Sequence, residues 1–180
     1  HPSESAMRVW LARHSPGMQA PTKLFNAEFY RKLYPEFKGS RLDLFEHFIR
    51  FGLHEGRVPN PMFDPAWYAS SYPCEDEEAE LPAYIHFLTI GADRGWCPSR
   101  AALPIYGMNG GASKPTLSDF LRLVTAFQKI SQRLSPERCF ALIAFFTPHL
   151  YECEEDLRGE PEGVQRFLHF LEVGLLQGRS

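Results

Sequence analysis

Three histidines recur at equivalent places in this 180-residue sequence. His47, His86 and His169 each stand directly before a phenylalanine and five residues before a glycine. Imidazole nitrogens are common ligands of zinc and other transition metals, so a metal site is one interpretation. Ligands of one ion must converge, however, whereas equivalent positions of a repeated structure lie about one repeat apart. We therefore expect structural or surface roles for these histidines, and no metal or other cofactor.

Other residues with reactive side chains lack the spacing that chemistry needs. The acidic runs at 75–78 and 152–156 do not alternate around a glycine turn, as calcium loops do, and we expect solvated helix ends there. The chain has no C-x-x-C pair and no G-x-S-x-G motif, and neither Cys139 nor Cys153 has a marked histidine partner. We expect no catalytic residues. The four cysteines are predicted to be free buried thiols, with a disulfide as the alternative: Cys74, Cys97, Cys139 and Cys153.

Aromatic residues make up 14% of the chain and are candidates for stacking on sugar rings. Packing in the core or between repeats is the alternative, and it is favoured for Trp67. Trp96 and Tyr106 stand near turns and a long loop, so we expect them to be more exposed. Together with the histidines they make up the candidate interaction surface: Trp67, Trp96, Tyr106, His47, His86 and His169.

These residues belong to a motif that occurs three times. The copies read FNAEFY (25–30) with HFIRFGLHEGR (47–57), FDPAWY (63–68) with HFLTIGADRGW (86–96), and FTPHLY (146–151) with HFLEVGLLQGR (169–179). The spacing from the first phenylalanine to the first glycine of the second segment is 27, 28 and 28 residues. Conserved order and spacing within one chain predict one supersecondary unit used three times.

The first half of each copy predicts the start of a helix. Asn26, Asp64 and Thr147 can cap an N-terminus by accepting a backbone N–H bond. A phenylalanine precedes each cap and a tyrosine follows it four residues later, which is the spacing of a hydrophobic staple. The Tyr-Pro pairs at 34–35 and 72–73 should end the first two of these helices.

The second half of each copy predicts another helix, with apolar residues at helical spacing and a glycine stop. We expect Gly52, Gly91 and Gly174 to end these helices in the left-handed conformation, which glycine adopts without a Cβ clash. The apolar stripes are Leu42, Phe45, Phe48 and Ile49, then Leu81, Tyr84, Phe87 and Leu88, and then Val164, Phe167, Phe170 and Leu171.

The predicted fold is all-α, with the helix pairs stacked as repeats in one domain over 24–180. Its copies span 24–60, 61–100 and 146–180. Between the second and third copies we expect an exposed loop at 101–115 and a helix pair at 116–146, which is either an insertion or a degenerate repeat. Residues 1–23 are an N-terminal extension with a short helix at 4–13.

Charge and hydropathy argue against nucleic-acid binding and against a membrane-spanning segment. The formal net charge of −3 disfavours nucleic acid, because phosphate binding needs a basic field. The longest apolar run, 139–146, is too short to span a membrane. The sequence opens with His1 and Pro2, without a methionine, which we interpret as an excised fragment or a processed terminus of a parent that carries the activity.

The pattern F-D-P-x-W-Y followed by H-F-L-x-x-G-x-x-x-G-R resembles a repeat of bacterial proteins. Tandem copies flank the glycosyltransferase domains of envelope-polysaccharide proteins and occur in some large surface proteins. The resemblance covers 25–57, 63–96 and 146–179, with departures at 147–150 and at Trp96, which replaces the terminal Arg. The chain shows neither an Asp-x-Asp motif nor a βαβ pattern for a sugar nucleotide.

The resemblance implies a non-catalytic accessory role in polysaccharide biosynthesis. We expect an interaction or scaffold module that docks a protein partner or the catalytic domain of its own parent, a glycosyltransferase, or that supports oligomerisation. The alternative is a glycan-binding module that holds the polysaccharide on exposed aromatic rings. The expected location is the cytoplasm, at the inner membrane face through partners.

Overall fold

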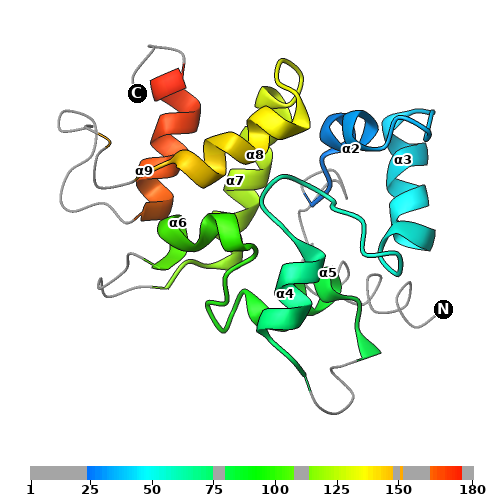
Figure 1. Cartoon of the computed structure of the whole chain (residues 1–180), viewed down its shortest axis with the longest axis horizontal. Coiled ribbons are helices and arrows are strands. Elements are labelled where there is room, and N and C mark those ends of the chain that lie inside the picture. The colour runs from blue at the N-terminus through cyan, green and yellow to red at the C-terminus, as the bar shows by residue number, and fades with distance from the viewer. Residues whose placement is uncertain (1–23, 75–79, 108–113, 148–150, 152–162, 176–180) are drawn as a thin grey trace.

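The fold is all-α, as predicted. The computed structural model describes residues 24–74, 80–107, 114–147, 151 and 163–175 (Figure 1). Of these residues, 64% are helical and none lies in a strand. No helix in these ranges is long and apolar enough to cross a membrane. The N-terminal extension with its expected helix lies outside the described residues, and so do both acidic runs.

The first helix of each of the first two copies begins and ends where the sequence predicts. Helix α2 spans Ala27–Leu33 and helix α4 spans Pro65–Ser71. The Asn26 side chain accepts a hydrogen bond from the N–H of Phe29 at 3.0 Å, and Asp64 accepts one from Trp67 at 3.1 Å. In the third copy, residues 148–150 and 152–162 lie outside the described part.

The staples are formed in all three copies. The ring centres are 5.0 Å apart for Phe25 and Tyr30, and 5.3 Å apart for Phe63 and Tyr68. In the third copy, Phe146 and Tyr151 are 5.7 Å apart. The phenylalanine and the tyrosine of each staple are buried, so the contact anchors the first half of each copy to the core.

The second helix of each copy widens into a π-helical turn. Helices α3 (Arg41–His47), α5 (Ala83–His86) and α9 (Gly163–His169) continue into η2 (Phe48–Gly52), η4 (Phe87–Gly91) and η7 (Phe170–Gly174). The widened turn shows in backbone bonds that reach five residues back, such as Leu53 N–H to the Phe48 carbonyl at 2.9 Å. Each copy therefore has its histidine directly before a π turn and its glycine at the end of that turn.

The predicted left-handed role of the first glycines is wrong. Gly52, Gly91 and Gly174 are the last residues of the π turns and have no positive φ. In the first two copies a positive φ occurs four residues later, at Gly56 (66°) and Gly95 (72°). A Cβ on Gly52 would lie 3.0 Å from the Tyr30 hydroxyl, and the same tyrosine of each other copy lies even closer to its glycine. Glycine is needed there because a tyrosine hydroxyl occupies the space of the side chain.

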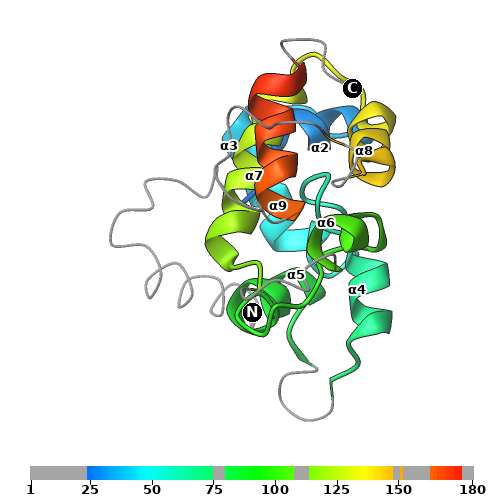
Figure 2. The same cartoon turned by 90° about the vertical axis from the view of Figure 1, so that its left-hand side faces the viewer.

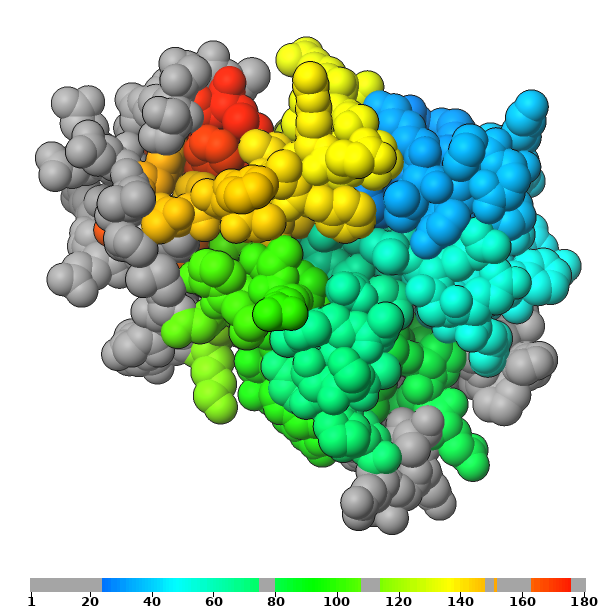
Figure 3. Space-filling model, in the orientation of Figure 1, coloured from blue at the N-terminus to red at the C-terminus, as the bar shows by residue number. Residues whose placement is uncertain are grey.

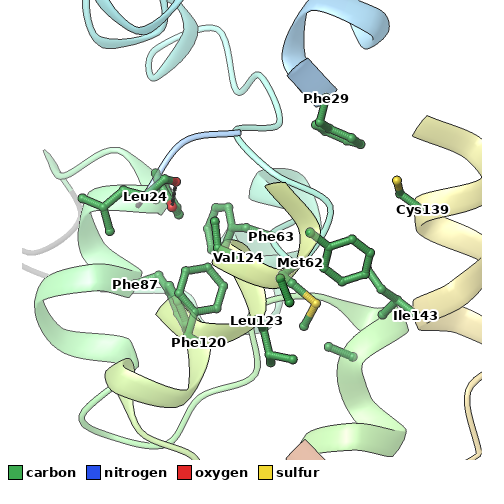
Figure 4. Close-up of a cluster of buried hydrophobic side chains, with 14 of the residues drawn as sticks. Leu24, Phe29, Met62, Phe63, Phe87, Phe120, Leu123, Val124, Cys139 and Ile143 are labelled. Carbon is green, nitrogen blue, oxygen red and sulfur yellow. Dashed lines mark hydrogen bonds between the residues drawn. The ribbon is translucent and has the colours of Figure 1, made fainter. Parts of the chain in front are cut away.

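Helix α7 (Leu117–Ile130) contacts α2, α9 and η7, and helix α8 (Pro136–Phe145) crosses it in Figure 1 but lies well apart from it in Figure 2. The predicted capping box of Thr116 and Asp119 starts α7. Phe120 of α7 packs on Phe87 of the second copy at 4.8 Å (Figure 4). Phe127 of α7 packs on Phe167 of the third copy at 6.0 Å. The second and third copies thus both pack on α7, and these contacts do not confirm the predicted stack of repeats.

The first copy is tied to the turn between α7 and α8. The Asn26 amide donates to the Ser131 hydroxyl at 2.9 Å. The Lys32 ammonium donates to the carbonyls of Ser131 at 2.6 Å, Gln132 at 3.2 Å and Leu134 at 3.1 Å. These carbonyls lie at the C-terminus of α7, where the helix dipole favours a cation. The helix pair at 116–146 is therefore built into the core of the fold.

Part of the predicted loop at 101–115 is helical and buried. Residues Arg100–Ala102 form a 3₁₀ turn that leads into helix α6 (Leu103–Gly107). Ile105 of α6 is fully buried, because α6 packs closely against the start of α9. The expected apolar stripe of the first copy also needs correction, since Leu42 is exposed.

Candidate functional site

A tyrosine–histidine hydrogen bond recurs in all three copies. The tyrosine hydroxyl of each staple meets Nδ1 of the histidine before the π turn. The distances are 3.1 Å for Tyr30 and His47, 2.9 Å for Tyr68 and His86, and 2.8 Å for Tyr151 and His169. Within the described residues, no three His, Cys, Asp or Glu side chains are placed to share a metal ion. The bond links the two halves of each copy.

The histidine of the second copy has a thiol at its other nitrogen. Cys74 Sγ lies 3.1 Å from His86 Nε2 and 3.5 Å from the Tyr72 carbonyl. His86 itself is buried, with 3% of its surface exposed, while Cys74 is half-buried. A thiol, an imidazole and the Tyr68 phenol therefore stand in one hydrogen-bonded row.

Aromatic rings pack around this row of hydrogen-bonded side chains. The Trp96 ring stacks on Tyr72 with centres 4.5 Å apart and an interplanar angle of 4°, and it lies 5.7 Å from the His86 ring at 18°. Trp67 meets Tyr72 edge-on at 6.0 Å. A cavity of about 270 Å³ opens beside the row, with Cys74 and His86 in its lining. We name Cys74, His86, Tyr68, Tyr72 and Trp96 the thiol site.

The first copy lacks this arrangement although it has the same staple, tyrosine–histidine bond and π turn. Glu36 holds the position of Cys74, and it pairs with Arg57, which holds the position of Trp96, at 3.2 Å. The Arg57 guanidinium lies over the rings of Tyr34 and Phe37 at 4.7 and 4.6 Å. His47 packs on Phe37 at 3.7 Å between ring centres. A charged pair replaces the thiol and the indole.

Cys97 and Cys139 are also free, as predicted, but neither thiol is placed for chemistry. Burial raises the pKa of Cys97 to about 12, and it also raises the pKa of Cys139. A thiol whose pKa is raised by burial holds its proton at neutral pH and is a poor nucleophile. Cys153 lies outside the described residues. Cys74 is thus the one cysteine in the described part that pairs with an imidazole.

The structure brings together three of the six candidate residues: Trp67, Trp96 and His86. His47 and His169 serve the other two copies. Tyr106 was expected to be exposed, but only 8% of it is, and its hydroxyl has no hydrogen-bond partner in the described part of the chain. Sequence reasoning missed Cys74, which stands twelve residues before its histidine with no periodic signal between them.

A second feature is an apolar groove between the end of α8 and the π turn η7. Its volume is about 790 Å³, and a second hollow of about 600 Å³ shares Leu134 and Leu175 with it. In Figure 3 the orange end of α8 lies beside the red C-terminal helix. The groove is lined by Leu134, Arg138, Ala141, Leu142, Phe145, Phe146, Thr147, Tyr151, Phe170 and Leu175.

Comparisons with known proteins give no assignment. No family model, no curated protein sequence and no solved structure matches this chain. The function must therefore be argued from the geometry of the thiol site, from the groove and from the resemblance carried by the repeated motif.

Proposed function

We propose that this chain is a non-catalytic interaction module that binds an amphipathic helix of a protein partner in the α8–η7 groove. The proposal rests on one observation, which is that the third copy exposes apolar positions that the other two copies bury. Equivalent residues within one chain provide the reference for this comparison, because they stand at the same place in the sequence relative to the staple and the π turn.

The residue directly before each staple phenylalanine shows the largest difference. Leu24 and Met62 are fully buried, whereas the equivalent Phe145 is 83% exposed. The residue after the first glycine follows the same trend, since Leu53 and Ala92 are buried and Leu175 is exposed. Contiguous apolar surface of this kind in a groove is characteristic of a binding site.

The buried copies indicate what kind of element should cover the groove. In the first copy, Tyr84 of helix α5 places its ring 6.0 Å from Phe48. In the second copy, Phe120 of helix α7 lies 4.8 Å from the equivalent Phe87. Each cover is thus an aromatic side chain supplied by a helix from outside the copy.

In the third copy, Phe127 of α7 packs on Phe167, but no ring from outside the copy lies on Phe170 among the described residues. Phe170, the equivalent of Phe48 and Phe87, meets only rings of its own copy: Phe146, Tyr151 and Phe167. We therefore commit to a helix that carries an aromatic anchor as the occupant of the groove. An apolar helix face laid into a groove is a common mode of protein recognition.

The composition of the groove disfavours the glycan-binding alternative. Arg138 and the hydroxyl-bearing residues Thr147 and Tyr151 are its polar members, and the Tyr151 hydroxyl is already bonded to His169. A sugar site needs several converging hydrogen-bond partners as well as an open ring. At the thiol site Tyr72 stacks on Trp96 and covers one face of the indole.

The resemblance of the motif supports a context for this binding. Repeats of this pattern accompany bacterial glycosyltransferases, so we propose that the partner helix belongs to polysaccharide-building machinery, including the catalytic domain of a longer parent. Docking would then hold the enzyme in place or support its oligomerisation, without turnover in this module.

The test uses a helix that already performs this role within the chain. A fluorescein-labelled peptide of residues 116–131 is titrated with the full chain while its anisotropy is followed. Saturable binding at micromolar concentration is expected, and Phe145→Glu should weaken it by about tenfold. Phe51→Glu is the matched control, because Phe51 is also exposed but lies in the first copy, outside the groove.

The anchor is tested separately on the peptide. A peptide with Phe120→Ala should bind more weakly than the parent peptide, since it lacks the aromatic ring. The proposal fails when the peptide does not bind, or when Phe145→Glu and Phe51→Glu weaken binding equally. A saturable change in tryptophan fluorescence at micromolar oligosaccharide, unaffected by Phe145→Glu, would favour the glycan alternative.

A further inference from the structure

The thiol site of the second copy has a geometry that none of the structural roles above requires. The tyrosine–histidine bond and the π turn are complete in the first copy without a thiol at the position of Cys74. Both copies also contribute buried apolar residues to the common core. Cys74 therefore adds chemistry to a unit that folds without it.

We propose that Cys74 is a site of reversible modification by low-molecular-weight disulfides, activated by His86. A nucleophile within hydrogen-bond reach of a base, with the base oriented by a third group, is the recurring arrangement of activated cysteines. Here Cys74 Sγ is 3.1 Å from His86 Nε2, and the Tyr68 hydroxyl is 2.9 Å from Nδ1. Tyr68 acts as the positioning residue.

The proton and the electrons balance in a single exchange. When Nδ1–H donates to the Tyr68 oxygen, Nε2 carries a lone pair that accepts the thiol proton. The Cys74 sulfur then attacks one sulfur of the disulfide, a new S–S bond forms, and the old one breaks. The second sulfur leaves as a thiolate and takes the proton from the imidazolium, so Cys74 ends in a mixed disulfide and one small thiol is released.

Access separates Cys74 from the other two described cysteines. Cys74 is half-buried and lines the cavity of about 270 Å³, which can admit part of a small disulfide. Cys97 is buried, and its thiol donates to the Ser99 carbonyl at 3.1 Å. Cys139 is fully buried next to the Ser131 hydroxyl at 3.7 Å. Selective modification at Cys74 follows from this contrast.

The sequence directly after Cys74 is acidic, so the effect of these charges has to be separated from the effect of His86. Four acidic residues, 75–78, follow Cys74 directly, and negative charge disfavours a thiolate. A peptide of residues 70–80 carries the same charges without the folded histidine contact. It is the reference that separates the effect of the local sequence from the effect of His86.

The experiment measures the rate of glutathionylation at neutral pH. The full chain and the reference peptide are incubated with oxidised glutathione, and the mixed disulfide is quantified by mass spectrometry with peptide mapping. Cys74 in the folded chain should react about three to ten times faster than in the peptide, whereas Cys97 and Cys139 should react more slowly folded than in urea. Added dithiothreitol should reverse the modification.

A matched pair of variants isolates the imidazole. His86→Asn keeps a polar atom near the Nδ1 position for Tyr68 but removes Nε2, so the rate at Cys74 should fall to that of the peptide. His47→Asn makes the same change in the first copy and should leave the rate unchanged. The proposal is overturned when Cys74 of the folded wild-type chain is glutathionylated no faster than the peptide, a result that does not depend on whether His86→Asn folds. It is also overturned when His86→Asn folds and its Cys74 reacts as fast as in the wild type.

Discussion

The second and third copies share the staple, the tyrosine–histidine bond and the π turn, but only the second copy is closed. Helix α7 lays Phe120 on the second copy, and the residue before its staple, Met62, is fully buried. In the third copy the equivalent Phe145 is exposed at the edge of a groove. The same local sequence pattern thus contributes to a closed core in one copy and to an open groove in the other, depending on which helix lies beside it.

The largest expected effect tests this comparison directly. Met62→Ala should lower the free energy of unfolding by about 3 kcal/mol, because it deletes a fully buried side chain and leaves a cavity. Phe145→Ala should change it by less than about 0.5 kcal/mol, since an exposed side chain loses few contacts on truncation. Urea denaturation of both variants gives the two values. A similar cost at both positions would contradict the contrast between closed and open copies.

The next prediction concerns the glycines. Gly91→Ala should destabilise the chain by about 2 kcal/mol, since the new Cβ would collide with the Tyr68 hydroxyl and force it away from His86. Gly56→Ala should lower the free energy of unfolding by about 1 kcal/mol. The new Cβ would meet no other atom, so the only cost is the strain of an alanine at a φ of 66°. Equal losses in urea denaturation would mean that backbone conformation, and not the tyrosine, selects the first glycine.

The local part of the fold could be predicted from the sequence. Caps such as Asn26 and Asp64 and the staple pairs were confirmed, because these contacts join residues within one helical turn and leave a signature at fixed spacing. The predicted left-handed conformation of Gly91 was wrong because the requirement for glycine comes from a residue that is distant in the sequence. The group that excludes its side chain, Tyr68, is 23 residues away in the sequence.

The arrangement of the copies and the thiol site depend on such distant contacts. The packing of the second and third copies on α7 follows from Phe120 and Phe127, which look like any amphipathic stripe in the sequence. The contact between Cys74 and His86 spans an acidic stretch without periodicity. One signal was available, since the staple tyrosine and the histidine recur 17 or 18 residues apart in all three copies.

A smaller effect is expected where the first copy meets α7. Lys32→Met keeps most of the apolar stem but removes the ammonium that donates to three carbonyls at the end of α7. The loss should be about 1 kcal/mol, because the site is partly exposed to solvent. Arg133→Met changes a charge in the same turn and, for comparison, should have little effect. A loss for Lys32→Met no larger than for Arg133→Met would show that the first copy does not depend on this cap.

The smallest expected effect concerns the N-termini of the second helices, which differ between the first two copies. Helix α3 starts with a capping box in which Asp43 accepts bonds from the Ser40 N–H and hydroxyl, both at 2.8 Å, while α5 starts at Pro82 without a side-chain cap. The Ser40 hydroxyl and N–H hold the pKa of Asp43 below its usual value. A carboxyl with a lowered pKa in the folded state stabilises the chain above its unfolded pKa, and this contribution is lost as pH falls through the folded pKa. Asp43→Asn should therefore melt slightly below wild type at neutral pH, and the two melting temperatures should converge in acid. A difference that stays constant across that acidic range would show that the charge of Asp43 contributes nothing beyond its hydrogen bonds.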